Sequence, residues 1–249
     1  MATIAALAGC GTASHPATDP QDAGSAEDGS SLADGGDATT DGEPPPMCLP
    51  GDVSHFLPTY TPPVGPNVGA CTSIQLEALV TDCFAAFASS ATCDPWENDP
   101  ANAACLGCWS GAATASRWAP YLYVNSPGET DYLNVAGCVA LADPGALSCA
   151  RSLEAALECD FAACLQACPI PTTSTLAGLQ MAQAALDDCY DRADQGGCKT
   201  FVDEATACAA PLQDGGAASF CFLASRQTPS LLQFFTLACG GATRDAGSD

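Results

Sequence analysis

A helical repeat of apolar residues begins directly after Cys71. Thr72 and Gln75 have the order of a capping box, in which the threonine hydroxyl and the glutamine side chain satisfy the first backbone amides of a helix. The residues that follow at spacings of three and four fall on one face of that helix. They are Leu76, Leu79, Cys83 and Phe87.

Aspartates mark three further predicted helix starts, because an Asp side chain caps the exposed amides and a following proline fits the first turn. Asp99-Pro100 precedes a helix with Cys105, Cys108, Trp109 and Ala112. Asp143-Pro144 precedes one with Leu147, Arg151, Leu153, Glu154 and Leu157. Asp160 is expected to cap a short helix that bears Cys164 and Cys168 and stops at Pro169.

The last third of the chain predicts one long helix and several short ones. The long helix opens at Ser174 or Thr175 and ends at Gly196-Gly197. Its stripe is formed by Leu176, Leu179, Gln183, Leu186 and Tyr190. Short helices fit residues 200–209, 217–226 and 229–239, the last of which lies between Thr228-Pro229 and Gly240-Gly241.

Two segments lack a helical pattern. The proline-rich stretch from Cys48 to Cys71 is expected to be irregular and to wrap the domain, held at both ends by cysteines. Trp118–Val124, particularly Tyr121–Val124, is strand-like, but a lone strand is marginal, so an extended link packed on helices is expected. The predicted class is therefore all-α: a disulfide-rich bundle of short helices over 48–240, with two halves, 48–168 and 169–240, as an alternative.

Residues 10–47 are expected to form a cysteine-led, disordered tether, and residues 241–249 a disordered tail. The tether has almost no large apolar side chains, so it cannot bury enough surface to offset the entropy of ordering. It has no Lys or Arg. Its acidic residues are Asp19, Asp22, Glu27, Asp28, Asp34, Asp37, Asp41 and Glu43. A flexible spacer is favoured over a calcium site, because the spacing lacks the EF-hand pattern.

The net charge and the apolar runs restrict the partners. With 6 basic against 29 acidic residues, the formal charge is −23, which disfavours binding to nucleic acids and to anionic lipid headgroups. Solubility and mutual repulsion explain the charge most simply, with divalent-cation binding as an alternative. No apolar run approaches the about 18–20 residues of a membrane span, so any membrane attachment needs another device.

The chain has 17 cysteines, a number that is typical of exported proteins with disulfides. The two histidines, His15 and His55, both precede the main cysteine region, so mixed Cys/His zinc sites are disfavoured, and a four-cysteine site is less favoured than disulfides. No metal or cofactor is predicted. The cysteines expected in disulfides are Cys48, Cys71, Cys83, Cys93, Cys105, Cys108, Cys138, Cys149, Cys159, Cys164, Cys168, Cys189, Cys198, Cys208, Cys221 and Cys239.

Leu7-Ala8-Gly9-Cys10 resembles the lipobox of bacterial lipoproteins. The resemblance implies cleavage before Cys10 and a lipid on its sulfur, and Gly11 points to the outer membrane. No basic residue precedes Cys10, although a signal peptide needs a basic start. We therefore expect residues 1–9 to be the remnant of a signal peptide whose start codon lies upstream of Met1. With the tether, the layout is similar to that of cysteine-rich bacterial lipoproteins, which implies a location in the cell envelope but no activity.

Candidate chemistry is sparse, and no catalytic residue is predicted. Cys105-x-x-Cys108 resembles a thioredoxin dithiol, but its place inside a helix favours cross-links to two other helices. Ser54 and His55 are merely sequence neighbours, which disfavours a hydrolytic triad. Asp187, Asp188, Asp191 and Asp194 are expected on the solvent face of the long helix, with a cation site as the alternative. Five aromatics are expected in a sparse core rather than in a binding patch: Trp96, Trp109, Trp118, Tyr121 and Tyr123.

Three functions remain after these exclusions. The favoured hypothesis is a non-enzymatic cell-envelope protein, held to the membrane by a lipid, that acts by binding or scaffolding. The alternative is a carrier of a hydrophobic small ligand, which would need an enclosed apolar cavity. The least favoured is an extracellular hydrolase with paired carboxylates, which would need two of the domain's acids to converge.

Overall fold

The computed structural model describes residues 48–61, 68–85, 90–112, 119–124, 130–169, 176–224 and 227–241. Cys10, the expected tether and most of the expected tail lie outside this part of the chain. The described residues are mostly helical, which confirms the predicted class with the addition of one small sheet. The helices are α1 (Ser73–Leu79), α2 (Ser90–Glu97), α3 (Ala103–Trp109), α4 (Val135–Ala142), α5 (Leu147–Cys164), α6 (Leu176–Gln195), α7 (Lys199–Gln213), α8 (Ser219–Leu223) and α9 (Thr228–Cys239).

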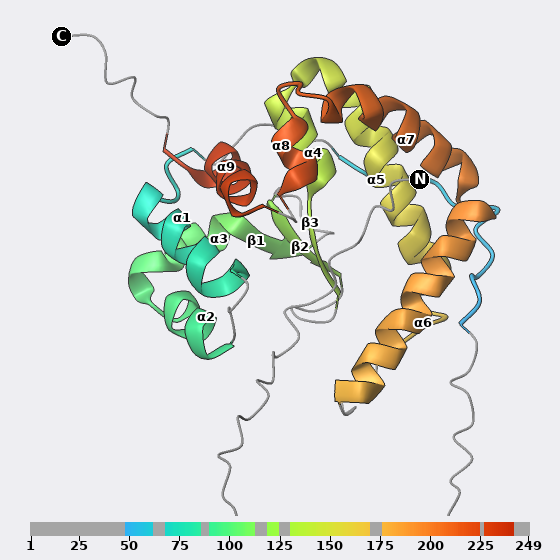
Figure 1. Cartoon of the computed structure of the whole chain (residues 1–249), viewed down its shortest axis with the longest axis horizontal. Coiled ribbons are helices and arrows are strands. Elements are labelled where there is room, and N and C mark those ends of the chain that lie inside the picture. Colours follow the sequence, from blue (N-terminus) through green and yellow to red (C-terminus); the bar gives the residue numbers. More distant parts are fainter. Residues whose placement is uncertain are drawn as a thin grey trace, which may run out of the picture.

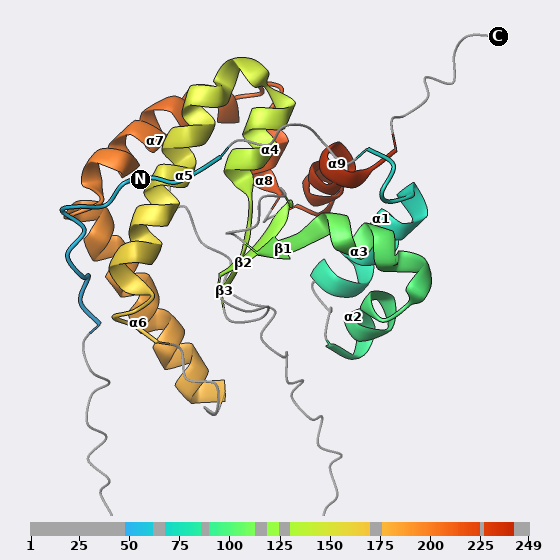
Figure 2. The same ribbon diagram turned by 180° about the vertical axis from the view of Figure 1, so that it is seen from behind.

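The helices are arranged around the sheet in two groups (Figure 1). α1, α2, α3 and α9 lie on one side, α5, α6 and α7 lie on the other, and α4 and α8 stand between them, as the view from behind also shows (Figure 2). The larger core includes Leu76, Leu79, Trp109, Phe234 and Phe235. A smaller core lies where the end of α5 meets α6 and the start of α7.

The predicted start of α1 is confirmed by its capping box. The Thr72 hydroxyl accepts a hydrogen bond from the Gln75 amide at 3.2 Å, and the Gln75 side chain accepts one from the Thr72 amide at 2.9 Å. The helix buries Leu76 and Leu79, and it continues as a π-helical turn over Val80–Phe84. Phe87, expected on the same face, lies outside the described residues.

The extended link expected at Tyr121–Val124 is wrong, because this segment is the central strand β2 of a three-stranded sheet. It pairs parallel to β1 (Ser110–Ala112) and antiparallel to β3 (Thr130–Leu133). The helix from Asp99-Pro100 correspondingly ends at Trp109, so Ala112 lies in a strand rather than in that helix. Strands of three or four residues are too short to show a clear alternation of apolar and polar positions.

The separate helix capped by Asp160 is also wrong. α5 runs from Leu147 to Cys164 without interruption, and Asp160 lies in its last turns. The stretch has no glycine or proline and is rich in alanine and leucine, so its helix propensity outweighs one potential cap. Cys168 follows α5 in a turn.

Other helix boundaries were predicted with mixed success. α6 ends at Gln195, directly before Gly196-Gly197, and α9 spans Thr228–Cys239, as expected. α7 continues beyond the expected end at residue 209 and past Pro211 to Gln213. Neither α2 nor α4 was predicted. α4 begins at Asn134, whose side chain accepts a hydrogen bond from the Gly137 amide at 2.7 Å.

Residues 48–61, which we call the strap, have neither helix nor strand and lie along α5 (Figure 2). The Gly51 amide donates to the Ala163 carbonyl at 2.8 Å. Phe56 packs edge-on against Phe201 of α7, with 5.3 Å between the ring centroids. The irregular, wrapping character expected of this region is thus found in its described part.

Eight disulfides link the elements, which confirms the expectation of a heavily cross-linked domain. Five of them connect residues up to 168 with residues after it, so the two candidate halves are covalently joined. The pairs are Cys48–Cys168, Cys71–Cys105, Cys83–Cys93, Cys108–Cys239, Cys138–Cys221, Cys149–Cys208, Cys159–Cys198 and Cys164–Cys189.

None of the helices in the described part of the chain has both the length and the apolar character that crossing a bilayer requires.

Candidate functional site

Helix α5 carries a buried acidic residue with a strongly raised pKa. Glu154 lies in the apolar stripe of this helix and is only 6% exposed. The Tyr132 hydroxyl of β3 donates a hydrogen bond to Glu154 Oε1 at 3.3 Å. Burial, and then the charge of Glu158, raise the pKa of Glu154 to about 7, although the hydrogen bond from Tyr132 acts in the opposite direction. Glu154 therefore changes its charge near neutral pH.

The strap lies close to this carboxyl group. Thr59 donates two hydrogen bonds to Glu158, from its amide to Oε2 and from its hydroxyl to Oε1, both at 2.7 Å. The hydroxyl of Tyr60 is buried and has no hydrogen-bond partner among the described residues. Burial raises the pKa of Tyr60, Glu154 raises it further, and Arg151 lowers it. We call Thr59, Tyr60, Tyr132, Glu154 and Glu158 the Glu154 cluster.

A second pair of carboxyl groups lies between α5 and α6. Asp160 and Asp194 are hydrogen-bonded to each other, and each also has a buried oxygen without a partner in the described chain. Burial raises the pKa of both, and for Asp160 the charge of Asp194 adds to the effect. The expectation that Asp194 lies on the solvent face is wrong, because this residue is half-buried against Asp160 of α5.

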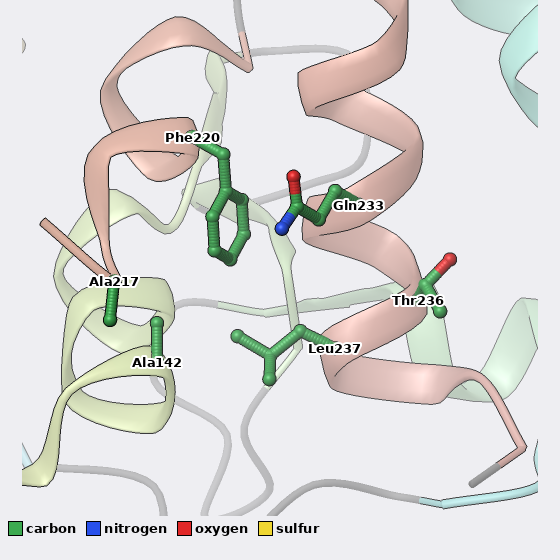
Figure 3. A pocket seen from close by; sticks show the side chains of 6 residues that line it. All are labelled: Ala142, Ala217, Phe220, Gln233, Thr236 and Leu237. Atoms are coloured by element: carbon green, nitrogen blue, oxygen red, sulfur yellow. The ribbon is translucent and has the colours of Figure 1, made fainter. Parts of the chain in front are cut away.

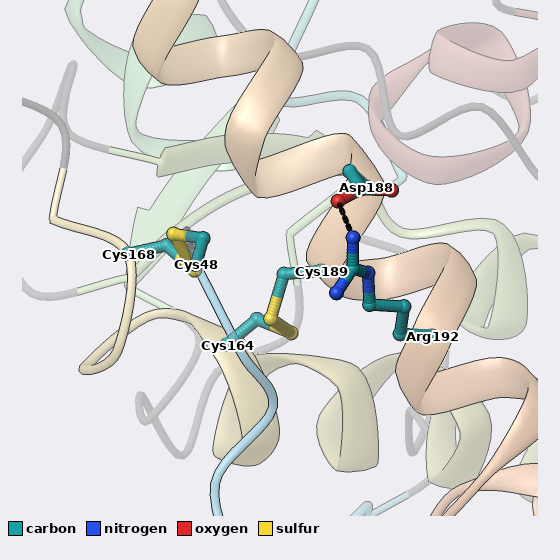
Figure 4. A network of polar contacts seen from close by, with 6 residues as sticks. All are labelled: Cys48, Cys164, Cys168, Asp188, Cys189 and Arg192. Atoms are coloured by element: carbon teal, nitrogen blue, oxygen red, sulfur yellow. Dashed lines mark ion pairs between the residues drawn. A yellow bond between two sulfur atoms is a disulfide. The ribbon is translucent and has the colours of Figure 1, made fainter. Parts of the chain in front are cut away.

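The three other aspartates of that group, Asp187, Asp188 and Asp191, are exposed as predicted. Asp188 forms an ion pair with Arg192 at 2.7 Å, close to the Cys164–Cys189 disulfide that joins α5 to α6 (Figure 4). No three acidic, histidine or cysteine side chains of the described residues form a set of metal ligands.

Two tryptophans of the expected aromatic core are buried, with exposed fractions of 6% for Trp96 and 4% for Trp109. Their ring centroids are 6.4 Å apart, and Trp109 also contacts Phe84 and Phe235. Neither indole N–H has a hydrogen-bond partner among the residues that the structure describes. Trp118 and the side chain of Tyr123 lie outside the described residues.

An open groove of about 270 Å³ lies between α4, α8 and α9 (Figure 3). Phe220 and Leu237 supply most of its apolar lining, and Gln233 and Thr236 supply polar groups. A carrier of a hydrophobic ligand needs an enclosed cavity of roughly 300 Å³ or more. This groove is open and smaller than that volume, so it does not meet the requirement for a carrier.

The remaining predicted chemistry does not come together in the described structure. Ser54 and His55 are both exposed on the strap. Cys105 and Cys108 bond to different partners, Cys71 ahead of α1 and Cys239 in α9, and not to each other. The prediction of cross-links to two other helices is thus correct for Cys108, whereas the partner of Cys105 lies just outside a helix.

Sequence reasoning did not identify the Glu154 cluster or the Asp160–Asp194 pair. One signal was present, since Glu154 fell within the predicted apolar stripe of its helix. The tyrosines come from segments without a periodic pattern, and their approach to α5 depends on the tertiary fold. Comparison of the chain with protein-family models, curated proteins and solved structures finds no match.

Proposed function

We propose that this chain is an exported cell-envelope protein that acts by binding or scaffolding rather than by catalysis. The observation that carries the proposal is the set of eight disulfides, since such frameworks form and persist in oxidising compartments outside the cytosol. A body with this many cross-links presents a fixed surface, and binding to a fixed surface loses little conformational entropy.

The proposal includes attachment to the outer membrane through a lipid on Cys10. Its support is the resemblance of Leu7–Cys10 to a lipobox, together with the use of the other sixteen cysteines in disulfides. Metabolic labelling with a fatty-acid analogue tests this part. We expect label on the wild-type protein and none on the Cys10→Ala variant, and label that persists on the variant would contradict the anchor.

Site-specific photo-cross-linking in the native envelope tests the binding role. A photoreactive residue is placed at Gln233 in the groove, at Gln180 on the exposed side of α6, and at Glu77 on α1. We expect discrete adducts from at least one position and none from the same position after the disulfides are reduced. Adducts from no position, or adducts that do not depend on intact disulfides, would contradict a rigid binding protein.

A hydrolase with paired carboxyl groups is the second candidate, and one observation favours it. Asp160 and Asp194 form a hydrogen-bonded pair of carboxyl groups that favours retention of a proton, because burial raises the pKa of both and the charge of Asp194 raises that of Asp160 further. Two carboxyl groups in direct hydrogen-bonding contact are the arrangement of aspartic proteases, whereas the two groups of a glycosidase stand about 5–9.5 Å apart. Measurable hydrolysis of a peptide substrate that is abolished in Asp160→Asn but retained in Asp214→Asn would therefore favour this candidate over the binding role.

A further inference from the structure

The strap is held to the body differently at its two ends. At the first end, the Cys48–Cys168 disulfide bonds it covalently to the turn after α5 (Figure 4). In its middle, Val53 and Phe56 pack into the core between α5, α6 and α7. At the far end, Thr59 is held by two hydrogen bonds to Glu158, and Tyr60 by the burial of its ring. Within residues 48–61, the disulfide is at the first end; the next disulfide along the chain, Cys71–Cys105, is formed ten residues after the far end.

The far end of the strap lies against two carboxyl groups, of Glu154 and Glu158, that are more stable with one negative charge between them than with two. Glu154 and Glu158 are one helical turn apart, so their carboxyl groups repel each other when both are ionised. Glu158 is stabilised by two hydrogen bonds from Thr59, whereas among the described residues Glu154 receives one, the 3.3 Å hydrogen bond from Tyr132.

The groups around Glu154 do not offset a second charge. Tyr132 of β3 and Tyr60 of the strap both interact electrostatically with Glu154. On α5 itself, Glu158 interacts with Glu154, and the exposed Arg151 interacts with Tyr60. Arg151 acts on Tyr60, which is also the residue whose buried hydroxyl is without a partner in the described chain. Water would solvate both the ionised Glu154 carboxylate and the Tyr60 hydroxyl. The Thr59–Tyr60 end of the strap can give water this access, because no disulfide is formed at that end.

We propose that the Thr59–Tyr60 end of the strap is a proton-controlled latch, closed on α5 while Glu154 carries a proton and released when Glu154 ionises. The disulfide at Cys48 confines the release to the far end of the strap, so the connection of the domain to the preceding chain is unchanged. Release frees the Glu158 carboxylate from Thr59, exposes the Tyr60 hydroxyl and gives water access to Glu154. The latch does not depend on the lipid anchor or on the binding role.

The pH range of the latch follows from the direction of the pKa shift. In the closed structure, burial and the charge of Glu158 raise the pKa of Glu154 from its ordinary value of 4.5 to about 7. Release of the strap gives water access to this carboxyl group and lowers its pKa, so the closed form binds the proton more tightly than the open form. Closure is therefore strongest at low pH and weakens as the pH rises toward 7. The closed-to-open ratio falls by at most a factor on the order of 10², the value for a full return of the Glu154 pKa to 4.5 on release.

Hydrogen exchange of the full chain with intact disulfides tests the latch. The Thr59 amide reports the far end, because it donates to Glu158, and the Gly51 amide reports the fixed end, because it donates to Ala163. After correction for intrinsic exchange, we expect Thr59 protection to fall at least tenfold between pH 5 and 7.5 and Gly51 protection to stay constant. Constant Thr59 protection, or an equal loss at both amides, would overturn the proposal.

Two variants distinguish release caused by ionisation of Glu154 from a general loosening of the strap. Glu154→Gln keeps the shape and a hydrogen-bond acceptor without a charge, so Thr59 protection should no longer depend on pH. If this variant does not fold, Tyr132→Phe serves instead. It removes the hydrogen bond that favours the ionised form and should move the midpoint of release to higher pH. If the midpoint pH of Thr59 deprotection is unchanged in Tyr132→Phe, or if Glu154→Gln keeps the wild-type pH profile, another group controls the release and the proposal is wrong.

Discussion

Asp160 of α5 and Asp194 of α6 share a hydrogen bond between their carboxyl groups. The two residues are far apart in the sequence, and the Cys164–Cys189 and Cys159–Cys198 disulfides beside them hold the two helix ends together. A pair of this kind destabilises the fold when both groups are ionised, because two adjacent carboxylates repel each other. The covalent cross-links therefore stabilise an electrostatically unfavourable contact.

The Asp160–Asp194 pair predicts that stability decreases as the pH rises. Because folding raises the pKa of Asp160, the folded chain binds more protons than the unfolded chain above the ordinary value of 3.8. The free energy of unfolding in urea, measured with intact disulfides, should fall from pH 4 toward pH 8. Asp160→Asn should reduce this fall by about 1–2 kcal/mol, because part of the pair is solvent-accessible.

Asp214→Asn is the matched control, since Asp214 is exposed at the end of α7. It should leave the pH dependence of unfolding unchanged. Equal slopes for Asp160→Asn and Asp214→Asn would contradict the role assigned to the pair.

The disulfides should contribute to stability according to the loop that each one closes. Cys108–Cys239 spans 131 residues and Cys83–Cys93 spans 10. In the chain-entropy treatment these loops correspond to about 5 and about 3 kcal/mol, values that the other cross-links reduce. Replacing Cys108 and Cys239 together by Ala should lower the unfolding free energy more than the equivalent change at Cys83 and Cys93. The reverse order in urea unfolding would contradict this ranking.

Phe235 should be the most sensitive of the large aromatic residues. It is 0% exposed and contacts Phe84, Trp109 and Phe234. Phe235→Ala should cost about 3–5 kcal/mol, because it removes buried area and leaves a cavity in a core that relies on alanine elsewhere. Ile74→Ala on α1 is the control, since Ile74 is 77% exposed and should change stability by less than about 0.5 kcal/mol. Similar losses in both variants would contradict the assigned core.

Gly197 should be sensitive to an added side chain because the Val53 side chain of the strap lies against this exposed residue. A Cβ atom at this position would lie 2.5 Å from Val53 Cγ2. Gly197→Ala should therefore destabilise the protein by about 1–3 kcal/mol, as overpacked cores do. Adding Val53→Ala should recover part of that loss, and a thermodynamic cycle of the two single variants and the double variant measures the coupling.

Gly107→Ala is the control for this experiment. Gly107 is exposed in α3, and a Cβ atom there would meet nothing within 4 Å. Because alanine is the better helix former, this change should be neutral or stabilising by up to about 1 kcal/mol. Additive effects of Gly197→Ala and Val53→Ala would show that the strap does not lie where the structure places it.

The sequence predicted what depends on neighbouring residues. The capping box at Thr72 and Gln75, the end of α6 before Gly196-Gly197 and the start of α9 at Thr228-Pro229 all involve groups within one helical turn. The sheet was not predicted, since β1 and β3 form only through pairing with β2, and none of the three strands has a strong pattern of its own. Asp160 was misassigned because a local cap was weighed without the propensity of the surrounding helix.

The Glu154 cluster and the Asp160–Asp194 pair could not be predicted from the sequence either, because both depend on contacts between distant segments. The strap brings Thr59 and Tyr60 onto Glu154 and Glu158 across about a hundred residues, and α6 brings Asp194 onto Asp160. No periodicity encodes contacts of this range. The cysteine count predicted that long-range cross-links exist, but not which cysteines would pair.

Disulfide mapping tests the central claim of a covalently fixed body most directly. The protein is taken from the cell envelope, alkylated without reduction, digested and analysed by mass spectrometry. The structure predicts no alkylated cysteine between Cys48 and Cys239, with Cys105 linked to Cys71 and Cys108 linked to Cys239. Several alkylated cysteines in this range, or a bond between Cys105 and Cys108, would contradict the account.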